Sequence, residues 1–406
     1  MIPFSVQVFV YKQIQFGMKL GAKVLNFRRP ELFAGPGSSL QLCDHIADTG
    51  VRKLLLVSDE TLLQIGLLGP MIERLESRGI AVATYTGVTP DPTIAQVEAG
   101  LAVLREHRCT AVLAVGGGSP IHAAKLIAAR ARNPHKVVHM AGLLRVVIPP
   151  LPLYAVPTTA GTGSEVTIAA VVSDPASTRK FAVMDPKLVP QAAALDAALM
   201  TGLPKPITVA TGMDALTHAV EAYLSYNATA ATDAEALEAT RLVMANLPKV
   251  VDDPGNLELR QHMALASFKG GAAFTAAGVG WVHAISHNLG ARYHVPHGWA
   301  NSIILPHVLD LYRSVCQARL ADLARVSGLD SADATEAELA DAFIAHIREL
   351  NVRFGVPTFV EQLQDADVPE IARAAVQETN WTYAVPVYMD DADCAAFVRR
   401  MLPVAV

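Results

Sequence analysis

The chain has few charged residues: Asp, Glu, Lys and Arg make up 17% of its 406 positions, whereas hydrophobic residues make up 51%. A disordered protein needs the opposite balance, because a highly charged chain with few apolar side chains cannot bury a core. Lys and Arg number 33 against 38 Asp and Glu, for a net charge of -5 without a concentrated basic run. Proteins that bind nucleic acids usually carry a basic face, so this composition argues against that function.

Cysteine is scarce and dispersed, because Cys43, Cys109, Cys316 and Cys394 stand far apart and form no CxxC pair. This spacing predicts neither a zinc knuckle nor a disulfide framework, and it suits a reducing compartment. No uninterrupted apolar run reaches the ~18 residues that a membrane span needs. The N-terminus also lacks the features of a secretory signal. We therefore expect a cytoplasmic protein without a membrane partner.

The chain is long enough for two or three domains, and its pattern changes near residues 202–204. Before this point, short β-branched runs alternate with helical stretches, which predicts an α/β domain with a parallel sheet covered on both faces. The strands are expected within 53–61, 82–87, 110–119 and 153–165, and helices within 71–79 and 94–107. After it, helical periodicity predicts an all-α domain with helices at 206–225, 231–248, 258–275, 298–312, 317–327, 335–353 and 390–402.

These patterns divide the chain into an N-terminal extension over 1–22, an α/β domain over 23–202 and a helical domain over 203–406. We expect a cleft between the two domains, since ligands commonly bind at domain interfaces.

A glycine-rich turn connects an expected strand to an expected helix in AVGGGSPIHAAK, residues 114–125. Gly116, Gly117 and Gly118 allow a phosphate to approach the backbone closely, and the N–H groups from Ser119 onward carry the positive end of a helix dipole. The spacing matches neither the Rossmann GxGxxG motif nor a Walker loop. A tight turn without a ligand therefore stays open as an alternative.

A second segment, PTTAGTGSE over residues 157–165, places hydroxyl groups among small residues. Thr158, Thr159 and Thr162 suit a second wall of a dinucleotide site. The alternative is an ordinary polar loop.

Two further segments, ATGMDALTHAVEAY over 210–223 and WVHAISHNLGARYHVPHG over 281–298, hold a candidate metal centre. Pairs of their Asp and His side chains stand four residues apart, on one face of a helix. Six of the 13 histidines lie between positions 218 and 297, a concentration that helix packing does not explain. One carboxylate and two or three imidazoles make a good site for Fe²⁺ or Zn²⁺. The candidates are Asp214, His218, His283, His287, His294 and His297.

Over roughly residues 23–400, these motifs closely resemble those of the iron-dependent (group III) alcohol dehydrogenase family. The resemblance implies an N-terminal α/β domain that binds NAD and a helical C-terminal domain that binds the metal, an architecture shared with dehydroquinate synthase. It also implies hydride transfer between a primary alcohol or aldehyde and NAD(H), with Fe²⁺ or Zn²⁺, in a homodimer or larger homo-oligomer.

The family's metal ligands map onto Asp214, His218, His283 and His297, and a histidine implicated in proton transfer maps onto His287. The resemblance also implies a set of cofactor contacts. It adds an acid near the adenosine ribose and a lysine of the cofactor cleft to the glycine and threonine segments. These residues are Asp59, Gly116, Gly117, Gly118, Ser119, His122, Thr158, Thr159, Thr162 and Lys180.

The sequence departs from the family pattern at three places. His122 replaces the usual acid of GGGSxxD, and residues 379–382 read Thr-Asn-Trp-Thr where Thr-Asn-Pro-Arg is usual, so the substrate is not determined by the resemblance. About 22 residues precede the usual start and could add a strand or a partner contact. For His122 two interpretations stay open: a neutral, packed imidazole, or a cofactor contact that makes NAD affinity depend on pH.

Three alternative functions share parts of this pattern. A glycerol dehydrogenase-like polyol oxidoreductase would use the same cofactor and metal. A dehydroquinate synthase-like lyase would need basic residues for a phosphorylated acid, whereas residues 260–300 offer Phe268, Phe274 and Trp281 with few cations. The third alternative, a non-catalytic relative that only binds the cofactor, is motivated by His122 and the altered pocket segment.

Overall fold

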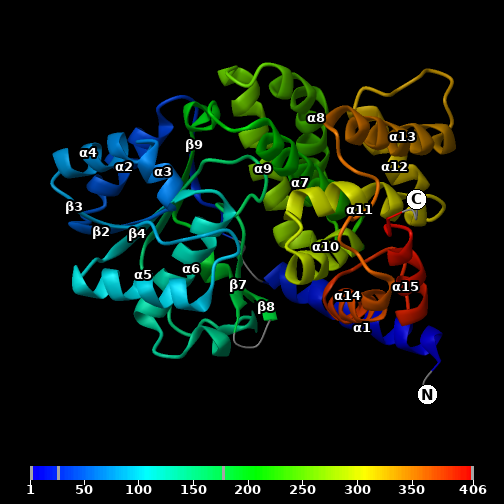
Figure 1. Cartoon of the computed structure of the whole chain (residues 1–406), viewed down its shortest axis with the longest axis horizontal. Helices are drawn as coiled ribbons and strands as arrows, with labels where there is room; N and C mark the ends of the chain where they lie inside the picture. The colour runs from blue at the N-terminus through cyan, green and yellow to red at the C-terminus, as the bar shows by residue number, and fades with distance from the viewer. Residues whose placement is uncertain (1–2, 25–27, 176–178, 404–406) are drawn as a thin grey trace. The chain divides into compact units, whose positions relative to one another are not determined.

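The computed structural model describes residues 3–24, 28–175 and 179–403, which fall into two compact units (Figure 1). The sheet unit comprises Phe27–Pro204 and Asp253–Phe268. The helical unit comprises Met1–Asn26, Lys205–Asp252 and Lys269–Val406. The chain therefore enters the helical unit at its N-terminus and returns to the sheet unit once after Pro204, a path that sequence periodicity does not reveal.

The sheet unit is built on six parallel strands in the order β1-β9-β6-β4-β2-β3. Every residue of β4 is buried, as expected for a continuous apolar run at the centre of a parallel sheet. Successive side chains point to opposite faces and pack into two separate cores. The strands are β1 (Glu31–Ala34), β2 (Lys53–Val57), β3 (Ala81–Tyr85), β4 (Ala111–Gly116), β6 (Leu153–Pro157) and β9 (Ala192–Leu195).

Helices cover both faces of this sheet, with α2 and α4 on one side and α5 and α6 on the other (Figure 1). This arrangement confirms the predicted α/β fold with a parallel sheet. The helices are α2 (Ser38–Asp48), α3 (Glu60–Gln64), α4 (Gly69–Ser77), α5 (Ile94–Glu106) and α6 (Gly118–Arg132), with short 3₁₀ helices at Val137–Met140, Pro186–Leu188 and Ala197–Met200. A small second sheet contains β5 (Gly142–Leu143), β8 (Arg179–Met184) and β7 (Ala169–Asp174), in that order.

The helical unit contains the long helices predicted from periodicity and three that the periodicity left out, α1, α10 and α14. The N-terminal extension forms α1, so no strand is found there over the described residues. Within the described residues, no helix combines the length and apolarity of a membrane-spanning segment. The helices are α1 (Phe4–Val24), α7 (Lys205–Leu224), α8 (Ala230–Asp252), α9 (Leu257–Ala277, which begins in the sheet unit), α10 (Trp281–Tyr293), α11 (His297–Tyr312), α12 (Gln317–Val326), α13 (Glu336–Phe354), α14 (Val368–Thr382) and α15 (Asp391–Arg399), with a 3₁₀ turn at Asp365–Asp367.

Candidate functional site

Close contact between α7 and α11 brings together residues that lie more than 80 positions apart. A Cβ atom on Gly298 would lie 2.0 Å from the carbonyl oxygen of Ala210, so the two backbones touch where only glycine fits. His297 begins α11 beside this contact, and Asp214 lies one turn further along α7 than Ala210. The glycine after His297 therefore positions that imidazole at Asp214.

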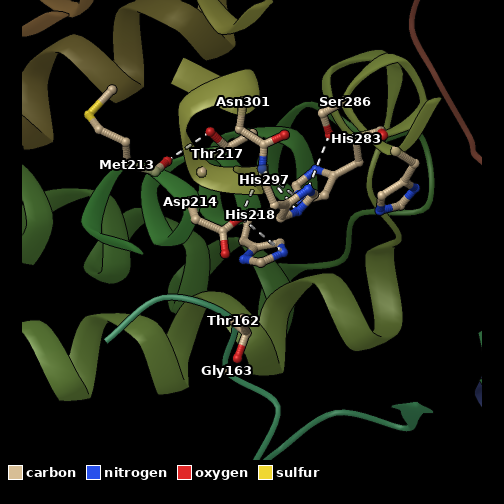
Figure 2. A network of polar contacts seen from close by, with 12 residues as sticks. Thr162, Gly163, Met213, Asp214, Thr217, His218, His283, Ser286, His297 and Asn301 are labelled. Atoms are coloured by element: carbon tan, nitrogen blue, oxygen red, sulfur yellow. Dashed lines mark hydrogen bonds and ion pairs between the residues drawn. The ribbon is translucent and has the colours of Figure 1, made fainter. Parts of the chain in front are cut away.

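The carboxylate of Asp214 is buried, and the three predicted imidazoles lie next to it (Figure 2). His218 and His283 are buried as well, whereas His297 is partly exposed. Its Oδ1 atom lies 3.9 Å from Nε2 of His218, 3.7 Å from Nε2 of His283 and 3.5 Å from Nε2 of His297. The His218 ring stacks between Phe274 and His283, with ring centroids 4.2 and 4.5 Å away. Among the described residues, Asp214, His283 and His297 thus place one donor atom each within 4.8 Å of one another. His218 joins them through its 3.9 Å distance to Asp214.

This donor set fits a divalent transition metal. Donor atoms bound at about 2.0–2.1 Å around a tetrahedral ion lie about 3.4 Å apart, close to the three distances from Asp214 Oδ1. Three imidazoles with one carboxylate suit Fe²⁺ or Zn²⁺ better than Mg²⁺ or Ca²⁺, which prefer oxygen.

Electrostatics favour a cation at the same point. Burial alone would raise the pKa of Asp214, but the imidazoles of His218, His297 and His283 outweigh it and hold this pKa well below its usual range. Burial would lower the pKa of His283, yet Asp214 and Glu221 on its two ring nitrogens raise it to about 9. Two carboxylates around one imidazole provide the negative charge that a divalent ion neutralises.

Glu221 contacts the outer side of the predicted ligand His283 and was not among the residues expected from the sequence. Its Oε2 lies 2.6 Å from Nδ1 of His283, and its Oε1 accepts a hydrogen bond of 2.7 Å from the backbone N–H of Val282. Both side chains are buried. A carboxylate on the outer nitrogen fixes the ring so that Nε2 faces Asp214. Its position three residues after His218, on the same helical face, is the signal that could have revealed it.

Asn301 contacts Asp214 from the inner side, at the same oxygen that the imidazoles surround. Its Nδ2 donates a hydrogen bond of 2.8 Å to Asp214 Oδ1 and lies 3.2 Å from Nε2 of His297. Its Oδ1 is buried without a hydrogen-bond partner among the described residues. Asn301 lies four residues after His297, so helical spacing could have identified this residue too.

His287 lies at the edge of the cluster, one turn after His283, with its side chain 28% exposed. Its Nδ1 lies 2.8 Å from Oε1 of Glu378, which also accepts a hydrogen bond of 2.7 Å from the hydroxyl of Tyr383. Burial would raise the pKa of Glu378, but His287 and the Tyr383 hydrogen bond lower it. Glu378 comes from the distant helix α14, so sequence spacing gives no signal for this contact.

In the sheet unit, the two predicted cofactor segments follow neighbouring strands. The N–H of Thr158 donates a 3.0 Å hydrogen bond to the carbonyl of Gly116, which joins the end of β4 to the end of β6. A Cβ atom on Gly118 would lie 2.8 Å from Cγ2 of Thr162, and one on Gly117 would lie 3.3 Å from Oγ1 of Thr159. The glycines therefore leave room for the threonine segment against the start of α6, where Ser119 lies in the first turn.

Two of the three remaining predicted cofactor residues, Asp59 and Lys180, lie elsewhere in this unit. Asp59 caps α3, because its Oδ1 accepts a 3.0 Å hydrogen bond from the N–H of Leu62. Lys180 on β8 forms an ion pair with Asp91. The structure thus gives both residues a contact within the protein.

His122 is held by Ser164, whose hydroxyl lies 2.8 Å from its Nε2. Burial, with smaller contributions from Lys125 and Lys180, lowers the pKa of His122 to about 3. The imidazole is therefore neutral near pH 7, which favours the packed interpretation over a charged cofactor contact.

Lys125, which ends the AVGGGSPIHAAK segment, is fully buried. Its ammonium donates to the carbonyl of Thr167 at 2.6 Å and to that of Ala169 at 2.9 Å. Burial lowers the pKa of Lys125 to about 7, although the charge of Glu165 opposes this shift. Lys125 therefore ties α6 to the segment that follows the threonines.

Comparison with known proteins gives a consistent result along the chain. The family model described as "Iron-containing alcohol dehydrogenase" matches residues 30–197, and that described as "Fe-containing alcohol dehydrogenase family, C-terminal" matches residues 208–402. The chain is 37% identical over 348 residues to a lactaldehyde reductase of Escherichia coli (strain K12), covering 85% of this chain and 91% of the relative. It is 34% identical over 378 residues to an NAD-dependent methanol dehydrogenase of Bacillus methanolicus, covering 93% and 99%.

Solved structures agree. A crystal structure of 1,3-propanediol oxidoreductase superposes with a TM-score of 0.89 at 36% identity, covering 93% of this chain and 99% of that chain. A sulfoacetaldehyde reductase from Bifidobacterium kashiwanohense, solved with NAD⁺, gives a TM-score of 0.83 at 27% identity, covering 93% and 98%. The chain therefore belongs to the iron-containing alcohol dehydrogenase family, as its motifs predicted, and is an oxidoreductase that interconverts alcohols and aldehydes with NAD(H) and an iron cofactor.

Proposed function

We propose that Asp214, His218, His283 and His297 hold the catalytic iron, with Zn²⁺ as a possible substitute. The observation that carries this proposal is the convergence of three Nε2 atoms, at 3.5 to 3.9 Å, on one carboxylate oxygen. When bound there, a divalent metal would act as a Lewis acid on the substrate oxygen.

The surrounding residues of the chain then perform two tasks. Glu221 and Asn301 hold His283 and Asp214 in place, so the site is formed before the substrate binds. His287 takes up the proton that the alcohol loses on oxidation and passes it to solvent, which its partly exposed side chain permits.

For the cofactor, we assign the glycine turn with Ser119 to the pyrophosphate and the segment with Thr158, Thr159 and Thr162 to an adjoining wall. The carboxylate of Asp59 accepts hydrogen bonds from the hydroxyls of the adenosine ribose, and its negative charge disfavours the extra phosphate of NADP. His122 and Lys180 complete the set of cofactor-binding residues. His122 is neutral and lies beside the cofactor. Lys180 would exchange its ion pair with Asp91 for the cofactor.

We further assign NAD binding to residues 23–202 and metal binding to 203–406, in a cytoplasmic homodimer or larger homo-oligomer. The substrate is a small primary alcohol or its aldehyde. Several relatives are named for short compounds of this kind, including lactaldehyde and 1,3-propanediol. Trp381 stands where a proline is usual in the family's pocket segment, so we expect a chain-specific preference.

A panel of short aldehydes with NADH tests this function. Lactaldehyde, 3-hydroxypropanal and unsubstituted aldehydes of equal length should be reduced, with one product alcohol for each NADH consumed. Preference for glycerol-derived ketones would support the polyol alternative instead. NADH binding without turnover of any member would support the non-catalytic alternative, and elimination of phosphate from a sugar acid would support the lyase.

A further inference from the structure

The N-terminal helix α1 packs on the same segment that holds the proton-transfer residue. Tyr11 is 8% exposed and lies edge-on to Trp381, with ring centroids 4.9 Å apart, and it stacks on Tyr388 at 5.9 Å. Nε2 of Gln15 donates a 3.3 Å hydrogen bond to the backbone carbonyl of Trp381. Trp381 lies in the last turn of α14, three residues after Glu378.

Lys19, four residues after Gln15, continues the contacts on the same face of this helix. The ammonium of Lys19 donates to the carbonyls of Tyr226 and Ala228 at 2.7 and 3.2 Å. These residues follow α7, the helix that carries Asp214 and His218. In Figure 1, α1 runs alongside α14 within the helical unit.

On the inner side, α14 presents Glu378 to His287. The carboxylate is shared between Nδ1 of His287 and the hydroxyl of Tyr383, which directly follows α14. Helix α14 thus links Tyr11 to His287, because its Trp381 contacts Tyr11 and its Glu378, one turn earlier, contacts His287. A helix that served only to cover the surface would not need three hydrogen bonds to the carbonyls of these particular segments.

We infer that α1 is a positioning element of the active site, which acts through Glu378 on His287. By fixing the end of α14, it keeps the Glu378 carboxylate on Nδ1, so that Nε2 of His287 stays directed to the reacting alcohol. This inference rests on the proposed role of His287. It gives a function to the residues that precede the family's usual start.

The experiment measures the rate of NADH formation in a single turnover of the metal-loaded, full-length enzyme. Tyr11→Ala removes the aromatic contact, and Gln15→Leu removes the hydrogen bond with little change in volume. Phe9→Ala is the matched control, because Phe9 lies on the same helix but is 62% exposed. We expect Tyr11→Ala to lower the rate about three- to tenfold, with a smaller loss for Gln15→Leu. Phe9→Ala and Tyr11→Phe should keep the rate of the unmodified enzyme, and KM for NAD should not change.

A double-mutant cycle with Glu378→Gln separates positioning from a general loss of stability. Glu378→Gln alone should lower the rate roughly tenfold or more, and adding Tyr11→Ala to it should cause no further loss. The inference is overturned if the two effects multiply, if Tyr11→Ala equals Phe9→Ala, or if Glu378→Gln has no effect. Metal content is measured in every variant, so a failure of the metal assignment would be seen separately, as lost metal.

Discussion

The helical unit and the sheet unit contribute to function in opposite ways. The proposed metal cluster depends on side chains that are present: carboxylates and imidazoles within hydrogen-bond or ligand distance of one another. The cofactor turn depends on side chains that are absent, because a Cβ at Gly118 would meet Thr162 at 2.8 Å. Changes in charge should therefore damage the first region, whereas added carbon atoms should damage the second.

The largest effect is expected for His218→Ala. Loss of one imidazole should release the metal and reduce turnover by about 10³-fold or more, since Lewis-acid stabilisation contributes several kcal/mol. Metal content by elemental analysis and kcat with a short aldehyde are the measurements. His307→Ala, a histidine of α11 outside the cluster, serves as the control and should retain metal. Full activity in metal-free His218→Ala enzyme would refute the assignment.

Glu221→Gln should have the next largest effect, on metal affinity itself. A neutral amide keeps the shape but removes the charge behind His283, and loss of such a partner costs about 10- to 100-fold in metal affinity. The affinity is measured by competition with a chromophoric chelator. Glu378→Gln, which alters the partner of His287, should keep the affinity of the unmodified enzyme. Equal losses in both variants would mean that Glu221 has no special role.

In the sheet unit, Gly118→Ala tests whether an added carbon atom damages the proposed cofactor turn. The added methyl group displaces Thr162, so we expect the Kd for NAD to rise about tenfold, while metal content stays the same. Gly202→Ala is the matched control, because nothing lies within 4 Å of its Cβ position. Calorimetric titration with NAD measures the Kd of both variants. An unchanged Kd in Gly118→Ala would mean that the glycine turn does not bind the cofactor.

Asp59→Asn probes charge within that same region. An asparagine can still cap α3 through Leu62 but no longer repels a phosphate, so the preference for NAD over NADP should fall about tenfold. The ratio of kcat/KM with NAD to kcat/KM with NADP measures this preference. Equal use of both by the unmodified enzyme would contradict the assigned role of Asp59.

The smallest effect is expected at His122. Because burial and nearby lysines lower its pKa to about 3, this imidazole stays neutral from pH 6 to pH 8. The Kd for NAD should therefore show the same pH profile in the unmodified enzyme and in His122→Asn. In the unfolded chain His122 takes up a proton below about pH 6.5, so the contribution of the neutral imidazole to the stability of the fold is complete above that pH and is lost towards pH 3. Tighter binding at pH 6 that disappears in the variant would restore the charged interpretation.

The sequence predicted some residues of these two regions and not others. The i,i+4 spacing of Asp214 with His218, and the glycine and threonine motifs, identified segments that the structure brings together, and strand–helix alternation predicted the parallel sheet. Glu221 and Asn301 share helical faces with the predicted ligands and could have been found by the same rule. Glu378 could not, since α14 meets α10 only through tertiary packing. The neutral state of His122 likewise depends on burial, which a motif does not record.

The most direct test of the central claim is metal reconstitution of the unmodified enzyme. The protein is stripped with a chelator, shown to be metal-free, and titrated anaerobically with Fe²⁺ while aldehyde reduction by NADH is followed. We predict no activity without metal and a linear return of activity that ends at one ion per chain, with no return in His218→Ala. Full activity of the metal-free enzyme, or equal reactivation of His218→Ala, would contradict the account.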